Sequence, residues 1–136
     1  MIKQIVISRR DLDLISSIAK RISTEICGMM LGEFKNDKTI VKKIIFGRNV
    51  RSSSVEFEMH PEDIYRAIML AEKNGYEIVA LFHSHPGKPI PSIYDLEGMS
   101  LWPLPWFIFS FEGNYKCFLY DGEEIRELDV LVIDKL

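Results

Sequence analysis

Two histidines, His83 and His85, stand two positions apart at the end of an apolar run and could share one metal ion. Residues two apart in a β-strand point to the same face of the sheet, so both imidazoles can approach the same point. A bare pair of this kind more often packs or hydrogen-bonds than binds a metal. The pair therefore indicates a metal site only if a third ligand comes from elsewhere in the chain.

A third ligand can come from the Ser-x-x-Asp pattern of Ser92 and Asp95, which follows a loop rich in proline. If Ser92 caps a helix, Asp95 lies in the first turn and points back toward the strand end. The same pattern alone favours a plain capping box, in which both side chains accept hydrogen bonds from free N–H groups of the helix. Because one stiff loop joins it to H-x-H-P, we interpret Asp95 as the third ligand.

Two histidines and a carboxylate leave an open coordination position for water, which is the arrangement of catalytic zinc sites. Zinc lowers the pKa of such a water to about 7, so a neighbouring carboxylate can take its proton. Glu25 is the candidate base, because it begins an apolar run in which burial would raise its pKa. Spacing alone leaves open that Glu25 is an exposed residue at a strand end. Non-haem iron oxygenases use a similar ligand set, but no pattern for a cosubstrate site accompanies it here.

The elements that must position these residues are predicted to form one α/β domain over residues 1–136. A chain of 136 residues, 47% hydrophobic and 27% charged, is typical of a single soluble domain with a core. Apolar steps of three and four predict helices, and β-rich runs between turn residues predict strands. The run 77–85 is apolar on both faces, which predicts a central strand. In the second helix, Ile64, Ile68 and Ala71 are expected to face the core. The predicted helices are 11–22, capped by Ser8, then 61–75 and 92–99, and the predicted strands are 25–34, 39–46, 54–59, 77–85, 106–111, 115–120 and 125–133.

Charge and cysteine usage disfavour several classes of protein. The net charge is −3 with both signs interleaved, so a nucleic-acid partner is not expected. Cys27 and Cys117 lie in apolar runs without close partners, which indicates reduced, buried thiols. The first residues lack the apolar region of a signal peptide and no run reaches membrane-spanning length, so we expect a cytoplasmic protein without a membrane partner. The sequence leaves the oligomeric state open. The segment 102–106 (WPLPW) either packs in the core or borders a substrate groove.

The run T-E-I-C-G-M-M-L-G-E-F, followed by H-S-H-P, a proline-containing loop and S-x-x-D, resembles the JAMM (MPN-plus) metalloprotease family, which includes deubiquitinating enzymes. The resemblance implies a single-domain MPN fold, similar to that of cytidine deaminase, with a mixed β-sheet flanked by helices. It implies one zinc ion per chain held by His83, His85 and Asp95. Glu25 would act as the acid/base, and Ser92 would donate a hydrogen bond to the oxyanion of the tetrahedral intermediate.

The resemblance also implies a reaction, which is hydrolysis of the amide bond after the C-terminal Gly-Gly tail of a ubiquitin-like or sulfur-carrier protein. The compact size favours a prokaryotic-type member of the family. Gly28 and Gly32 would allow close backbone packing beside the site. Six residues separate His85 from Ser92, one fewer than in many members, which affects the loop rather than the ligands. Two alternatives stay open: removal of cysteine or another adduct from a sulfur-carrier protein, and a non-catalytic MPN scaffold, which the complete set of site residues disfavours.

Overall fold

The computed structural model describes residues 1–51 and 58–135, in which helices pack against a mixed β-sheet. No helix within these two ranges is long and apolar enough to cross a membrane. The predicted strand 54–59 lies largely outside the described residues, and Met59 at its end forms an isolated bridge with Asn49. The described elements are, in chain order, β1 (Gln4–Ser8), α1 (Arg9–Arg21), β2 (Cys27–Lys35), β3 (Lys38–Gly47), α2 (Pro61–Asn74), β4 (Glu77–His85), α3 (Ile93–Leu101), β5 (Trp106–Ser110), β6 (Tyr115–Tyr120) and β7 (Ile125–Ile133).

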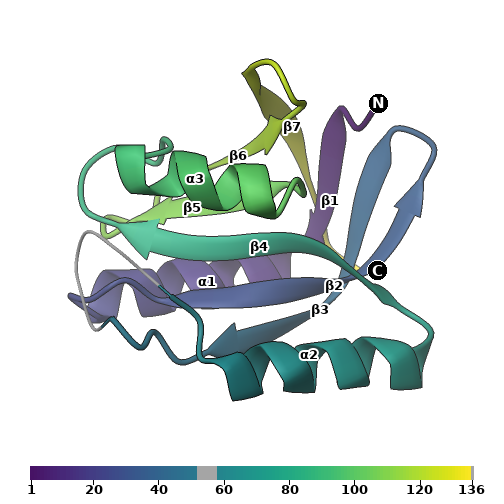
Figure 1. Cartoon of the computed structure of the whole chain (residues 1–136), viewed down its shortest axis with the longest axis horizontal. Coiled ribbons are helices and arrows are strands. Elements are labelled where there is room, and N and C mark those ends of the chain that lie inside the picture. The colour runs from purple at the N-terminus through teal and green to yellow at the C-terminus, as the bar shows by residue number, and fades with distance from the viewer. Residues whose placement is uncertain (52–57, 136) are drawn as a thin grey trace.

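The strands form a closed ring in the order β1-β3-β2-β4-β5-β6-β7. The expected mixed sheet is confirmed, because β4 pairs antiparallel with β2 and parallel with β5. These two neighbours also make β4 a central strand, as predicted, and Figure 1 shows it running across the middle of the molecule. The closure of this sheet into a ring was not part of the expectation of a mixed sheet flanked by helices. The reason is β1, which the sequence analysis did not predict and which closes the ring by pairing in parallel with both β3 and β7.

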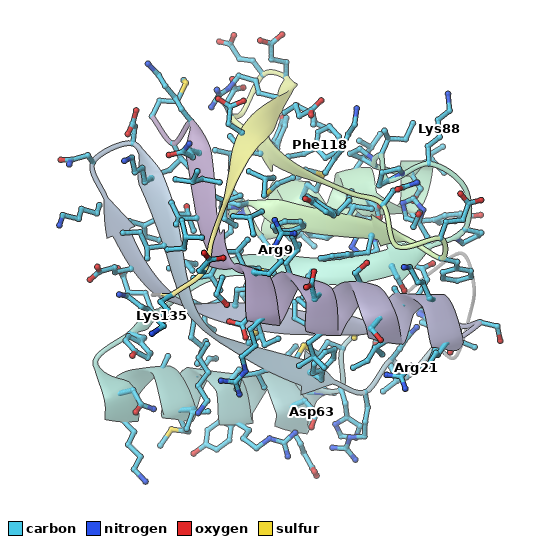
Figure 2. The ribbon with its side chains drawn as sticks, turned by 180° about the vertical axis from the view of Figure 1, so that it is seen from behind. Arg9, Arg21, Asp63, Lys88, Phe118 and Lys135 are labelled. Carbon is cyan, nitrogen blue, oxygen red and sulfur yellow. The ribbon has the colours of Figure 1, made fainter. Side chains whose placement is uncertain are left out.

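Helix α1 packs against one side of this ring. Its N-terminus is capped by Ser8, as predicted, because the Ser8 hydroxyl oxygen accepts a hydrogen bond from the amide of Asp11 at 3.1 Å. Figure 2 shows α1 lying in front of the strands, with Arg9 and Arg21 labelled at its ends. The core on this side takes residues from α1 and from each described strand: Ile5, Ile7, Leu12, Ile15, Ala19, Ile26, Met30, Val41, Val79, Ala80, Phe82, Phe107, Phe109, Cys117 and Leu128.

Helices α2 and α3 contribute to a second core on the other face of β4 (Figure 1). In α2 the buried residues are Asp63, Ala67 and Ala71, whereas Ile68 is 41% exposed. The expectation that Ile68 faces the core was wrong, because α2 directs Asp63, Ala67 and Ala71 toward the sheet instead. The buried carboxylate of Asp63 accepts a hydrogen bond from the guanidinium group of Arg48. The second core consists of Cys27, Met29, Met59, Ala67, Leu81, Met99, Trp106, Ile108 and Phe118.

Two glycines let β2 approach its neighbours closely, but of the two only Gly28 lies beside the site, because Gly32 pairs with Glu77 at the other end of β4. A Cβ atom at Gly28 would collide with the ring of Phe82 and with the carbonyl oxygen of Ile45. A Cβ atom at Gly32 would collide with the carbonyl oxygen of Ile40. The strand that follows Glu25 therefore lies tightly between β3 and β4, which fixes its end relative to the end of β4.

Candidate metal centre

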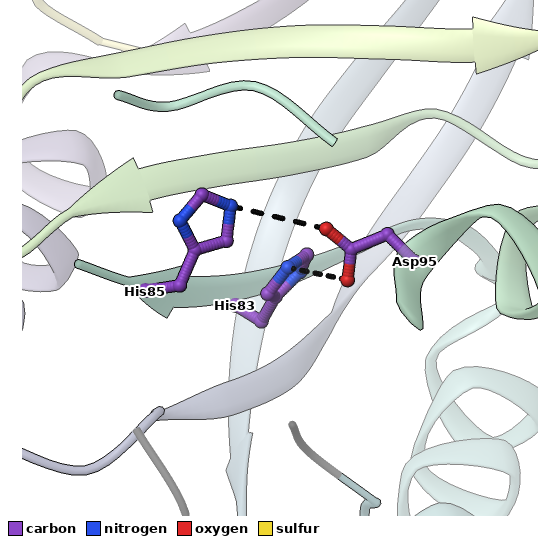
Figure 3. Close-up of side chains that lie close together, drawn as sticks. All are labelled: His83, His85 and Asp95. Atoms are coloured by element: carbon purple, nitrogen blue, oxygen red, sulfur yellow. Dashed lines mark ion pairs between the residues drawn. The ribbon is translucent and has the colours of Figure 1, made fainter. Parts of the chain in front are cut away.

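The three predicted metal ligands come together at the C-terminal end of β4. His83 and His85 lie on this strand, and Asp95 reaches them from the first turn of α3 (Figure 3). The Nε2 atom of His83 is 3.1 Å from Oδ1 of Asp95, and Nε2 of His85 is 3.8 Å from Oδ2. All three residues are buried, and one potential ligand atom from each lies within 4.8 Å of the other two.

Strand geometry sets the positions of the two imidazoles. Within β4 the side chains alternate, so His83 and His85 share the face that carries Leu81 and the second core. The ring of His83 makes an edge-to-face contact with Trp106 at a centroid distance of 5.6 Å. His83 also pairs with Cys27 across the β2–β4 ladder. Its ring is therefore held between the sheet, an aromatic neighbour and the carboxylate of Asp95.

The loop between β4 and α3 folds around His85. Its Nδ1 atom lies 3.0 Å from the carbonyl oxygen of Pro86, and its Nε2 atom lies 2.9 Å from the carbonyl oxygen of Ile90. Both ring nitrogens therefore face loop carbonyls, which hold the orientation of the imidazole, and a metal bound at His85 would replace one of these two contacts. The loop of six residues before Ser92 thus orients His85 and still brings Asp95 to both histidines.

The Ser-x-x-Asp pattern forms a complete capping box and also supplies a side chain to the cluster. The hydroxyl oxygen of Ser92 accepts a hydrogen bond from the amide of Asp95 at 3.3 Å, and the amide of Ser92 donates to Oδ2 of Asp95 at 2.8 Å. The second carboxylate oxygen, Oδ1, faces His83. The two interpretations of this pattern are therefore compatible, because the cap orients the carboxylate toward the histidines.

The electrostatics of the cluster favour an ionised Asp95. Burial alone would raise the pKa of this carboxyl group, but the hydrogen bond and charge of His83 oppose it. The amide of Ser92 and the charge of His85 act in the same direction as His83. The net effect places the pKa of Asp95 below its ordinary value of 3.8. An anionic carboxylate beside two imidazoles is a donor set that suits a divalent transition metal.

The spacing of the donors also fits a tetrahedral ion. Zinc bonds to imidazole nitrogen and carboxylate oxygen are about 2.0–2.2 Å long, which separates tetrahedral ligand atoms by about 3.3–3.5 Å. The separations of 3.1 Å and 3.8 Å that Asp95 makes with His83 and His85 lie on either side of this range. Two of the three donor pairs are therefore close to the spacing of a tetrahedral site.

Glu25 is buried, with 2% of its surface exposed, and immediately precedes Ile26 and β2. The amide of Ser84 donates to the carbonyl oxygen of Ile26 at 3.0 Å, so Ile26 lies opposite Ser84. Because Cys27 pairs with His83, Glu25, two residues before Cys27, lies near the end of β4 that carries the histidines. The possibility of an exposed strand-end glutamate is thereby excluded. The charge of Glu25 also contributes, after burial and Asp63, to raising the pKa of the nearby Cys27 to about 12.

A cavity of about 460 Å³ opens beside Asp95, between α3 and the end of β2. Trp102 and Trp106 line it, and Trp106 also belongs to the second core, so the segment 102–106 packs and borders a cavity at once. Arg51 and Glu58 form another part of the wall and make an ion pair at 3.2 Å. Sequence reasoning missed these two residues, because nothing in their local pattern distinguishes them from other surface charges.

Comparison with known proteins gives consistent results for sequence and fold. Residues 10–119 match the family described as prokaryotic homologs of the JAB domain. A desampylase from Pyrococcus furiosus is 38% identical over 130 residues, covering 94% of this chain and 90% of that protein. A probable TtuB-protein conjugate cleaving protease from Thermus thermophilus is 30% identical over 87 residues, covering 62% and 58%. The solution structure of a protein from Desulfitobacterium hafniense shares the fold, with a TM-score of 0.84 at 23% identity over 97% of this chain and 94% of that one.

Proposed function

The chain belongs to the prokaryotic homologs of the JAB domain, and we propose that it is a JAMM-type zinc hydrolase that cuts protein conjugates. Its substrate is the amide bond after the C-terminal Gly-Gly tail of a ubiquitin-like or sulfur-carrier protein. The observation that carries the proposal is the buried cluster of His83, His85 and Asp95 at the end of β4. The names of the relatives, a desampylase and a probable conjugate cleaving protease, support the same reaction.

In this proposal His83 and His85 bind one zinc ion through ring nitrogens, and Asp95 binds it through its ionised carboxylate. When bound, zinc supplies a water of lowered pKa and polarises the scissile carbonyl group. The three residues leave one position of a tetrahedral ion for solvent or substrate. Burial of all three excludes bulk water, which strengthens every charge interaction within the site.

Glu25 and Ser92 carry the proton and hydrogen-bond chemistry. Glu25 takes the proton of the attacking water and delivers it to the leaving amine, which is the role of a general acid/base. Ser92 uses its hydroxyl oxygen as an acceptor for the amide of Asp95, so its O–H hydrogen remains to be donated. That hydrogen can stabilise the oxyanion that develops on the substrate carbonyl.

The cavity beside Asp95 is the proposed path of the substrate tail. A volume of about 460 Å³ accommodates a short extended peptide, and its wall includes Trp102, Trp106 and, from the metal cluster, Asp95. Close to the cluster the tail backbone must approach buried groups, which glycine permits because it has no Cβ atom.

We further infer that residues 1–136 act as one MPN-type domain, related in architecture to cytidine deaminase. We also infer that the protein acts in the cytoplasm.

The experiment that tests the function combines elemental analysis with a cleavage assay. Purified protein is analysed for zinc and incubated with linear fusions and lysine-linked conjugates of the host's own ubiquitin-like proteins. We expect about one zinc per chain and cleavage directly after the Gly-Gly tail. The variant His83→Ala should lose both zinc and cleavage. The matched control is His60→Ala, because His60 caps α2 and lies outside the cluster.

Two results would contradict the proposal. If His83→Ala kept full zinc occupancy, the ligand assignment would be wrong. If zinc-loaded wild-type protein cut none of the conjugates, the chain would be a binding scaffold or would act on a smaller adduct. Release of cysteine from a sulfur-carrier C-terminus in the same assay would identify the second of these.

A further inference from the structure

The peptide unit that joins Glu25 to Ile26 is held by a side chain on each side. The Nδ2 atom of Asn49 donates to the carbonyl oxygen of Glu25 at 2.9 Å. The amide of Ile26 donates to the hydroxyl oxygen of Ser84 at 3.0 Å. Both groups belong to the same planar peptide, so these two hydrogen bonds fix its position and its orientation together.

This peptide lies just before the N-terminal end of β2, which begins at Cys27. Hydrogen bonds from the side chains of Ser84 and Asn49 therefore hold the backbone next to Glu25, where the β2 strand has not yet begun. Ser84 stands between the two histidines of the cluster and is fully buried. The short segment that presents the predicted metal ligands thus also anchors the backbone of the predicted base.

The side-chain oxygen of Asn49, Oδ1, makes a second set of hydrogen bonds. Its Oδ1 atom accepts hydrogen bonds from the amides of Arg51 and Glu58, both at 3.0 Å. These two residues form an ion pair on the wall of the cavity beside Asp95. The Asn49 side chain therefore links the backbone of Glu25 to the cavity wall. Its Nδ2 donates to the Glu25 carbonyl oxygen, and its Oδ1 accepts from the amides of Arg51 and Glu58.

We propose that Asn49 is a positioning residue for catalysis, which together with Ser84 clamps the Glu25–Ile26 peptide and so aims the Glu25 carboxylate. The inference rests on the proposed function, in which Glu25 is the general acid/base. A base must stay within hydrogen-bond reach of the proton that it takes, about 2.6–3.2 Å between heavy atoms. A displacement of the backbone by about 1 Å would break this geometry and can lower a rate by about 10²-fold.

The variant Asn49→Asp separates the two tasks of the side chain. A carboxylate keeps an acceptor for the amides of Arg51 and Glu58, but it replaces the donor that faces the carbonyl oxygen of Glu25. We expect kcat to fall by roughly 10- to 100-fold with KM little changed, while zinc stays bound. The matched control is Asn74→Asp, because Nδ2 of Asn74 also donates to a backbone carbonyl, that of Leu70 at 2.8 Å, at the far end of α2.

A second pair of variants tests the other half of the clamp. Ser84→Ala removes the acceptor for the amide of Ile26 and should lower kcat in the same way as Asn49→Asp. Ser84→Thr retains the hydroxyl group and should restore most of the rate. A purely structural role for Ser84 would lower the melting temperature and zinc content along with the rate, and this result would overturn the proposal.

Amide hydrogen exchange at Ile26 distinguishes failure of the clamp from failure of the proposed function, because it requires no turnover. Exchange of the Ile26 amide should be faster in Asn49→Asp than in wild type or in Asn74→Asp. If kcat and exchange in Asn49→Asp both equalled those of wild type, the proposal would be overturned. Faster exchange with unchanged kcat would also overturn it. A wild-type protein that binds zinc but cuts no conjugate would refute the function, whereas faster exchange in the variant would still support the clamp.

Discussion

Asp95 uses its two carboxylate oxygens for different purposes. Oδ2 accepts from the amide of Ser92 and completes the cap of α3, while Oδ1 faces His83. Because the cap fixes the rotation of the carboxylate, the fold of the helix terminus and the geometry of the cluster depend on one another. The hydrogen bond from the Ser92 amide also lowers the pKa of Asp95, in the same direction as the two histidines.

The first prediction at the scale of single residues concerns Glu25. Glu25→Gln keeps the size of the side chain but removes its ability to take a proton. We expect about one zinc per chain as in wild type, with loss of nearly all turnover. The matched control is Glu33→Gln, because Glu33 is exposed further along β2. The measurement is kcat/KM on one conjugate together with zinc content, and near-native activity of Glu25→Gln would require a different base.

The second residue prediction separates the two roles of Ser92. Ser92→Ala should lower the free energy of unfolding by about 1 kcal/mol through loss of the cap. It should also lower the rate by roughly 10²- to 10³-fold, which is the effect of removing one oxyanion donor. Ser8→Ala is the control, since Ser8 caps α1 in the same way away from the cluster. A rate loss no larger in Ser92→Ala than in Ser8→Ala would limit Ser92 to capping.

At the scale of elements, local signals predicted most helices and strands, and long-range pairing explains the rest. The cap at Ser8 and the apolar run 77–85 are visible in the sequence, and both were confirmed. β1 was missed because it is a strand of five residues whose partners, β3 and β7, lie far away in the chain. The same reason applies to Asn49, whose bond to the Glu25 carbonyl spans 24 positions and leaves no periodic pattern.

The buried carboxylate of Asp63 connects two elements of the fold. Oδ2 of Asp63 accepts hydrogen bonds from the amide of Arg48 at 2.7 Å and from its Nε at 3.0 Å, which joins the end of β3 to the first turn of α2. These bonds lower the pKa of Asp63 from 3.8 to about 2. The lowered pKa means that the ionised form stabilises the folded state. This stabilisation is present above pH 3.8 and is lost as the pH falls toward about 2.

We therefore expect Asp63→Asn to be less stable than wild type at neutral pH, by roughly 2 kcal/mol for lost hydrogen bonds to a charged group. The difference should shrink between pH 3.8 and about pH 2. Unfolding by denaturant at a series of pH values measures it. Asp13→Asn is the control, because among the described residues Asp13 forms an exposed pair with Arg9 and such pairs contribute little. A constant difference down to pH 2 would mean that the charge of Asp63 does not stabilise the fold.

At the scale of the whole molecule, the closed ring places the cluster where several elements of the fold meet. β4 lies between β2 and β5, α3 covers its end, and the two cores hold the strand from both faces. The cavity beside Asp95 opens at this junction, and in the proposed function a substrate tail reaches Asp95 along a wall built from α3 and the end of β2.

From this arrangement we expect the rate of cleavage to depend more on the tail side of the scissile bond than on the acceptor side. His83 is fully buried and Asp95 is 4% exposed, so the part of the tail next to the cluster must pass close to protein atoms. Glycine permits this approach because it has no Cβ atom. In the proposed function the acceptor side of the bond lies away from the buried cluster, and we expect a side chain there to meet fewer constraints.

Replacing the terminal Gly-Gly of the carrier by Ala-Ala should therefore lower kcat/KM by roughly 10²-fold, the effect of misplacing the reacting atoms by about 1 Å. Replacing residues on the acceptor side should change kcat/KM far less. The test measures both series on the same ubiquitin-like carrier, with zinc content checked in each preparation. Replacing the acceptor lysine conjugate by a linear fusion provides the matched comparison, since the tail is then identical. Equal sensitivity in the two series, or indifference to Ala-Ala, would mean that the site does not select a Gly-Gly tail.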